Sequence, residues 1–188
     1  QSQAVYKSIE KDLKSSSGIM NLNTCKDFDQ IASYVGSLNI EHSAPQGINT
    51  DNVLLGSTFI VGGQIKGQQH ELYLVYPQGN YIRPADSKPY LVIGEVKYGK
   101  PILDRVIKPD VSIGDASRCA LISMDSTLKS DLTVGPPIDF AVLKKDADKL
   151  SSLECLNVTD ETYSKVCNQW SDGIFKVFDS FPRFNWEK

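Results

Sequence analysis

The sequence has few of the residues that build metal centres and disulfide frameworks. Its 188 residues include four cysteines and two histidines, with no C-x-x-C pair and no histidine near a cysteine. The thiols belong to Cys25, Cys119, Cys155 and Cys167. This spacing argues against a zinc site, and a chain of this length can bury a core without disulfides. We therefore expect reduced core thiols, no metal and no cofactor.

An excess of one charge and long hydrophobic runs are also lacking. Lys+Arg number 20 and Asp+Glu number 23, giving a net charge of −3, whereas nucleic-acid-binding domains usually carry a basic face. No apolar run approaches the ~20 residues of a membrane-spanning helix, and no secretion signal is visible at the start of the chain. The sequence thus predicts a cytoplasmic protein with no nucleic-acid partner and no membrane partner.

Glycine-rich phosphate-binding motifs are missing too. Neither G-x-G-x-x-G nor G-x-x-x-x-G-K-[ST] occurs in the sequence, so a nucleotide-binding loop is not indicated. The pair Gly62–Gly63 lies within an apolar, β-branched run, and we interpret it as a turn or bulge.

Hydrophobic spacing predicts helices at both ends of the chain and strands between them. We expect helices over residues 4–13 and 26–38, the second capped by Thr24 with Asp27, and strands over 56–65, 71–76, 81–82 and 90–93. Further helices are expected over residues 98–106 and from Ser112 onward, the latter with an apolar face of Ile113, Ala116, Ala120 and Met124. A strand over 138–143 and a final helix from Thr159 follow, with the aromatic side chains of that helix in the core. Segregated helices and strands favour an α+β fold or an αββα sandwich over a doubly wound sheet.

Two segments are dense in polar side chains. Residues 93–105 place Glu95, a lysine and a tyrosine between a strand and a helix, and residues 125–137 gather hydroxyls and carboxylates at a helix end. Ser, Thr and Asp are common at helix ends because they cap and turn the chain. From their chemistry alone, these segments indicate no more than an α+β domain without a recognisable motif.

Together, three segments resemble a known family. They are FIVGGQIKG…LYLVYPQGNYI at the hairpin, IGEVKYGKPILDRVI at the next corner, and CALISMDSTLKSDLTVGPPIDFAVLKKD further on. They resemble the Anbu-type bacterial proteasome-like proteases, relatives of the proteasome β-subunit and of the HslV peptidase. The resemblance covers about residues 1–142 and continues weakly into the helix of Trp170.

The resemblance implies a four-layer αββα sandwich of the N-terminal nucleophile hydrolase type, forming a single domain over residues 1–188 with its N-terminal strands missing. It implies hydrolysis of peptide bonds by the hydroxyl of an N-terminal threonine, whose α-amine, helped by a lysine and an aspartate, handles the proton. A backbone amide near a glycine would bind the oxyanion. The implied partners are a peptide or unfolded protein substrate, further copies of the chain in a ring or helical ring, and an unfoldase.

The sequence departs from the family at its first residue, because the side chain of Gln1 is an amide and has no nucleophilic hydroxyl. We expect the threonine and the strands that carry it to lie outside these 188 residues. In related β-subunits a serine–aspartate pair ahead of a glycine turn braces the amine. The resemblance places the supporting candidates in two segments: Ser130, Asp131, Thr133, Gly135 and, near another active-site serine, Glu95.

Three functions remain open at this point. The first is a threonine peptidase subunit whose nucleophile is absent from the given chain. The second is a non-catalytic structural subunit of a proteasome-like assembly. The third is an unrelated α+β domain that binds a small molecule, for which a monomer with a closed apolar pocket is expected.

Overall fold

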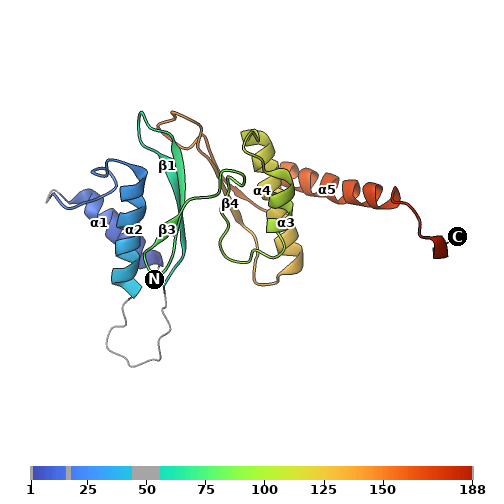
Figure 1. The fold of residues 1–188 in the computed structure, drawn as a ribbon, viewed down its shortest axis with the longest axis horizontal. Coiled ribbons are helices and arrows are strands. Elements are labelled where there is room, and N and C mark those ends of the chain that lie inside the picture. Colours follow the sequence, from blue (N-terminus) through green and yellow to red (C-terminus); the bar gives the residue numbers. More distant parts are fainter. Residues whose placement is uncertain (1, 16–17, 44–55, 188) are drawn as a thin grey trace, which may run out of the picture. The chain divides into compact units, whose positions relative to one another are not determined.

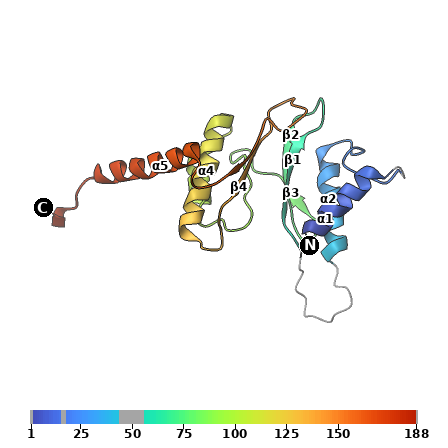
Figure 2. The same ribbon diagram turned by 180° about the vertical axis from the view of Figure 1, so that it is seen from behind.

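The computed structural model describes residues 2–15, 18–43 and 56–187. Contacts along the chain divide it into two units, which Figures 1 and 2 show from opposite sides. Unit 1 is Gln1–Ile93 with Leu143–Asp148, and unit 2 is Gly94–Val142 with Lys149–Lys188. Both units combine helices with a small antiparallel sheet, which confirms the prediction of a mixed α and β fold.

In its described residues, unit 1 has two helices and a three-stranded antiparallel sheet of order β1-β2-β3. Its elements are α1 (Ser2–Lys14), α2 (Phe28–Ser43), β1 (Phe59–Gln64), β2 (His70–Val75) and β3 (Tyr81–Ile82). The two predicted helices, the hairpin and the short third strand are all present. In both views α2 lies against one face of the sheet and α1 lies against α2 (Figures 1 and 2).

The core of unit 1 forms where the apolar face of α2 meets the sheet. Phe28 of α2 stacks on Tyr73 of β2, with ring centroids 6.2 Å apart. Gly62 and Gly63 pair in regular register with Leu72 and Glu71, so the predicted turn or bulge at this glycine pair is wrong. A Cβ at Gly63 would make an ordinary van der Waals contact with the Phe28 ring at 3.4 Å.

The ends of α2 differ from the prediction. Asp27 is the residue that caps the helix, because its Oδ1 accepts a hydrogen bond from the Gln30 amide at 2.8 Å. Thr24 instead accepts a bond from the Asn21 amide in the preceding turn. The helix also continues to Ser43, since the buried Asn39 side chain donates to two backbone carbonyls of the hairpin segment, those of Ser57 and Tyr76.

The strand predicted over residues 90–93 is not formed. A strand needs a neighbour for its backbone groups, and the described structure pairs none with this segment. The Tyr90 amide instead donates to the Lys88 carbonyl in a tight turn beside the isolated bridge between Ala85 and Lys88.

Unit 2 combines three α-helices with a two-stranded antiparallel sheet. Its elements are α3 (Lys100–Val106), α4 (Ile113–Ser130), β4 (Ile138–Val142), β5 (Ser152–Leu156), α5 (Glu161–Asp179) and a 3-10 turn, η1 (Asn185–Glu187). The Ser112 cap of α4 is confirmed, because its hydroxyl accepts from the Asp115 amide at 3.0 Å. Strand β5 was not predicted from the sequence. Its apolar interior residues, Leu153 and Cys155, are both exposed, so no buried face was there to be recognised.

The buried face of α4 is more polar than predicted. Ile113 and Met124, expected on the apolar face, are exposed. Three of the five buried residues, Cys119, Ser123 and Thr127, follow one another at four-residue spacing, and the other two are Leu121 and Asp125. A Cβ at Gly99, just before α3, would lie 2.9 Å from the Ser123 carbonyl oxygen, so small residues allow the two chain segments to approach closely.

Helix α5 is buried only in its first half. Tyr163 and Cys167 pack with residues of α4 and β4, as predicted for the core, whereas Ile174 and Phe178 are exposed and contradict that prediction. The helix begins after Asp160 rather than at Thr159. Within the three described ranges, no helix has both the length and the hydrophobicity to cross a membrane.

Candidate functional site

The residues predicted from the family resemblance lie in unit 2, at the C-terminal end of α4 and in the loop before α3. Ser130 is the last residue of α4 and is exposed. Asp131 caps that end, its amide donating to the Thr127 carbonyl at 2.8 Å. Gly135 follows the turn in the loop, and an added Cβ there would meet nothing within 4 Å.

Asp131 and Thr133 form the best-defined pair in this loop. The Thr133 amide donates to Asp131 Oδ1 at 2.8 Å, and the Thr133 hydroxyl donates to the same oxygen at 2.7 Å. These two bonds, first the one from the side chain, lower the pKa of the Asp131 carboxyl below its usual value, and the charge of Lys97 adds to the effect. Asp131 is therefore an anchored carboxylate at neutral pH, and no described residue donates to its other oxygen, Oδ2.

Glu95 is connected to this loop through Lys97. Glu95 Oε1 accepts the Lys97 amide at 2.8 Å, and Lys97 Nζ lies 3.8 Å from Glu95 Oε2. Because the same ammonium also acts on the carboxyl of Asp131, the structure brings both predicted acids into the field of one lysine. Gly94, with φ +81, provides the left-handed turn that leads into Glu95.

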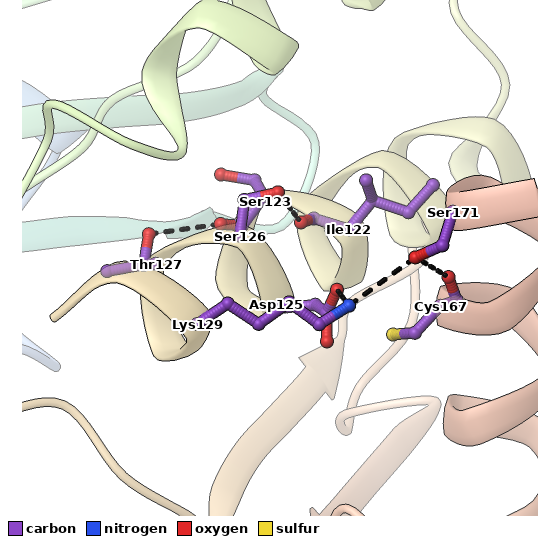
Figure 3. Close-up of polar contacts among 8 residues, drawn as sticks. All are labelled: Ile122, Ser123, Asp125, Ser126, Thr127, Lys129, Cys167 and Ser171. Atoms are coloured by element: carbon purple, nitrogen blue, oxygen red, sulfur yellow. Dashed lines mark hydrogen bonds and ion pairs between the residues drawn. The ribbon is translucent and has the colours of Figure 1, made fainter. Parts of the chain in front are cut away.

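A second polar group lies along α4, one turn before the loop (Figure 3). Asp125 is a buried carboxylate whose Oδ2 lies 2.7 Å from Lys129 Nζ. Lys129 also reaches Ser171 Oγ of α5 at 3.5 Å, and that hydroxyl donates to the Cys167 carbonyl. The pair thus joins α4 to α5 through a network of polar contacts. On the other side of α4, Thr127 donates to the Ser123 carbonyl at 3.0 Å.

An open pocket of about 610 Å³ lies beside this network, between α4, α5 and the loop. Asp125, Lys129 and Tyr163 line it, together with Val134 and Pro136, the two neighbours of Gly135. The Tyr163 hydroxyl is buried and has no hydrogen-bond partner within the described part of the chain. Burial is the main cause that raises the Tyr163 pKa, so the phenol stays protonated at neutral pH.

Sequence reasoning did not single out the pocket residues Asp125, Lys129 and Tyr163 as a group. One signal was present, because an acid four residues before a lysine favours an ion pair on a helix. No local sequence pattern predicted that α5 lines this pocket, because this depends on how α4 and α5 pack. In the residues that the structure describes, no cluster of three or more His, Cys, Asp or Glu side chains could hold a metal ion.

Comparison with protein-family models gave no match, and comparison with curated proteins gave none. Solved structures do match. Anbu from Hyphomicrobium sp. strain MC1 is 35% identical over 97% of this chain and 76% of that chain, with a TM-score of 0.86. Anbu (ancestral β-subunit) from Yersinia bercovieri is 32% identical over 98% and 76%, with a TM-score of 0.88. The helical assembly of the Anbu complex from Pseudomonas aeruginosa is 35% identical over 97% and 76%, with a TM-score of 0.83.

These similarities define the class as that of the proteasome-like β-subunits. Within that class, the chain belongs to the Anbu family. The family resemblance predicted from three sequence segments is therefore confirmed.

Proposed function

We propose that this chain belongs to a threonine peptidase subunit that hydrolyses peptide bonds, with its nucleophile on an N-terminal threonine outside these 188 residues. The observation that carries the proposal is the anchored carboxylate of Asp131. Two donors from Thr133 fix its Oδ1, and Oδ2 is left without a described donor. A fixed, ionised carboxylate of this kind suits the binding of a protonated amine.

In the proposed mechanism, the α-amine of the threonine is neutral when the hydroxyl attacks the peptide carbonyl and accepts the hydroxyl proton. The Asp131 carboxylate then stabilises the ammonium group that forms. Thr133 holds the carboxylate through two hydrogen bonds, and Ser130 precedes that carboxylate at the end of α4. The open backbone at Gly135 would give a substrate chain access to it. Glu95 acts indirectly, by holding Lys97 near Asp131. The substrate would be a peptide or an unfolded protein, and an unfoldase would deliver the latter.

The proposal includes the architecture that such peptidases use. Residues 1–188 would contribute to one four-layer αββα sandwich of the N-terminal nucleophile hydrolase type, whose first strands lie outside this chain. The protein would be cytoplasmic and would assemble with its own copies into a ring or helical ring. The helical assembly of the Pseudomonas aeruginosa relative supports this self-association.

The test uses the protein expressed from its complete coding sequence. Mass spectrometry should find a mature N-terminal threonine, and fluorogenic peptides and an unfolded protein should be cleaved. Asp131→Ala should lower kcat by about a hundredfold or more, in the range that general acid–base groups contribute, while Asp110→Ala, in the turn before α4, should leave it unchanged. Assembly without any turnover would instead support the alternative of a non-catalytic structural subunit.

A further inference from the structure

The open pocket beside the pair of Asp125 and Lys129 has no part in the proposed chemistry. Its volume of about 610 Å³ falls within the range of about 300–1,000 Å³ that small-ligand sites usually have. Its lining comes from the second half of α4, the first half of α5, and the segments before β4 and after β5. All of these belong to unit 2, so the pocket is formed within a single unit.

Aliphatic side chains make up a large share of the lining. They are Leu128, Val134, Pro136 and Val158. Val158 is 51% exposed, so its side chain is accessible to a ligand. Contact with these residues would remove apolar surface from water on both sides. The pocket therefore favours a ligand that carries a large aliphatic group.

Only two of the lining residues carry a charge, and their charges cancel. Asp125 Oδ2 and Lys129 Nζ lie 2.7 Å apart. An anionic ligand would meet the Asp125 carboxylate and a cationic ligand would meet the Lys129 ammonium, and each would lose hydration on entering. An uncharged ligand avoids this cost. The pocket thus favours a ligand without a net charge.

Both members of the pair retain hydrogen-bonding capacity. The Lys129 ammonium has three donors, and in the described residues it contacts two acceptors, Asp125 and Ser171 (Figure 3). The Asp125 carboxylate has about four acceptor positions, and it interacts with Lys129 and with the Cys167 thiol. A ligand with one acceptor beside one donor would use both remaining capacities. An amide group has this combination.

Two further lining residues favour a chain of amides over a single one. Asn168 is exposed, and its side-chain amide can both donate and accept. The Tyr163 hydroxyl is buried and has no partner in the part of the chain that the structure describes. An unpaired buried hydroxyl costs free energy, which an acceptor on a ligand would recover. A peptide supplies an amide at every residue.

We propose that this pocket binds an uncharged peptide segment through one large aliphatic side chain and the backbone amides beside it. Val134 connects the pocket to the candidate site, because it lines the pocket and its amide donates to the Asp131 carbonyl at 3.2 Å. A peptide bound here would contact the loop that carries Asp131. The inference goes beyond the proposed function, since binding requires neither the nucleophile nor turnover.

The first test compares three leucine probes of different charge on the full-length protein by saturation-transfer NMR. Acetyl-leucine amide is neutral, acetyl-leucine is an anion, and leucine amide is a cation at about pH 6, where an α-amine is protonated. The neutral probe should bind about fivefold more tightly than either charged probe. Equal or tighter binding of a charged probe would overturn the inference.

Variants then locate the neutral probe. Val158→Trp should fill the pocket and abolish binding, whereas Val158→Thr has nearly the same shape as valine and should change the dissociation constant by less than about twofold. Lys129→Met should weaken binding by about tenfold, because it removes a charged donor. Lys165→Met, on the exposed face of α5, is its control. Circular dichroism shows that each variant is folded, and binding that survives in folded Val158→Trp would overturn this location.

A longer probe separates a peptide from another small amide. Acetyl-Ala-Leu-Ala amide should bind several-fold more tightly than acetyl-leucine amide, and weaker binding would overturn the assignment of a peptide. The proposed function fails separately. Probe binding without any peptide cleavage would overturn the peptidase and support the pocket, whereas cleavage by a protein that binds none of the probes would overturn this inference alone.

Discussion

Thr133 donates both its backbone amide and its hydroxyl to a single oxygen of Asp131, Oδ1. A threonine two residues along the chain therefore fixes both the orientation and the ionisation of the one carboxylate on which the proposed chemistry depends. The relationship is local, so it can be tested without disturbing the rest of the unit.

Replacing Thr133 by valine should raise the pKa of Asp131. The side-chain donor is the largest cause of the lowered pKa and is lost, while the backbone donor remains. A carboxyl whose pKa is lowered in the folded state adds stability above its ordinary value of 3.8, and this gain disappears as the pH falls through the folded pKa. The variant should thus be less stable than the wild type at pH 7 and equal to it in strong acid.

Carboxyl NMR titration measures the Asp131 pKa directly, and urea unfolding at several pH values measures the stability difference. Thr133→Ser is the matched control, because serine retains the hydroxyl and should keep the pKa low. An unchanged pKa in Thr133→Val would show that the hydroxyl does not donate to this carboxylate in solution.

Gly99→Ala should destabilise the protein by about 1–3 kcal/mol, the usual cost of forcing an extra carbon into a packed site. The new Cβ would lie 2.3 Å from the Ser123 hydroxyl and 2.9 Å from its carbonyl oxygen. Gly173→Ala is the opposite case, since a Cβ there meets nothing within 4 Å and alanine favours the helix by about 0.5–1 kcal/mol. Chemical unfolding measures the free energy of unfolding of both variants. Equal changes in this free energy would contradict the close approach of α4 at Gly99.

Lys129→Met should lower the free energy of unfolding by about 1 kcal/mol. It leaves the buried Asp125 carboxylate without its cation, but the lysine side chain is 57% exposed, so solvent weakens the pair. The control is Lys165→Met on the exposed face of α5. In the double variant Asp125→Asn/Lys129→Met, part of the loss should be recovered. Strict additivity in this cycle would mean that the two side chains do not interact.

Alkylation of the folded protein should modify Cys155 before the other thiols. Cys25, Cys119 and Cys167 are buried, whereas Cys155 is exposed. Desolvation and the charge of its cross-strand neighbour Asp139 raise the pKa of Cys155, so its reaction should be slow at pH 7 and accelerate as the pH rises. Asp139→Asn should speed it, because the neighbouring negative charge that raises the pKa of Cys155 is removed. Mass spectrometry follows the adducts, and early modification of a second site would contradict the burial of the other thiols.

Sequence patterns predicted those elements whose burial is regular. The face of α2 from Phe28 to Leu38 buries mainly large apolar side chains between the sheet and α1, so the helical period is clear in its sequence. Helix α4 has neighbours on more than one side, and its contact with the segment at Gly99 is made by Ser123 and Thr127. A hydrophobic pattern does not predict burial of that kind, because close approach favours small residues there and not large ones.

The candidate site was likewise predictable from the sequence only in part. The position of Asp131 came from family resemblance, and its partner Thr133 lies only two residues further along the chain. The link from Glu95 through Lys97 joins segments more than thirty residues apart, and the sequence alone contains no rule that brings them together. The exposed half of α5 has the same period as its buried half, so spacing predicted an apolar face without specifying what covers it.

The division of the chain into two units has a practical consequence. The backbone passes from one unit to the other after Ile93, after Val142 and after Asp148. A fragment that ended at Ile93 would lack Asp146, which both accepts from and donates to the Gln64 side chain of β1. No single cut therefore yields either unit intact, so truncation is a poor way to assign functions to them, and point substitutions within the whole protein are the better tool.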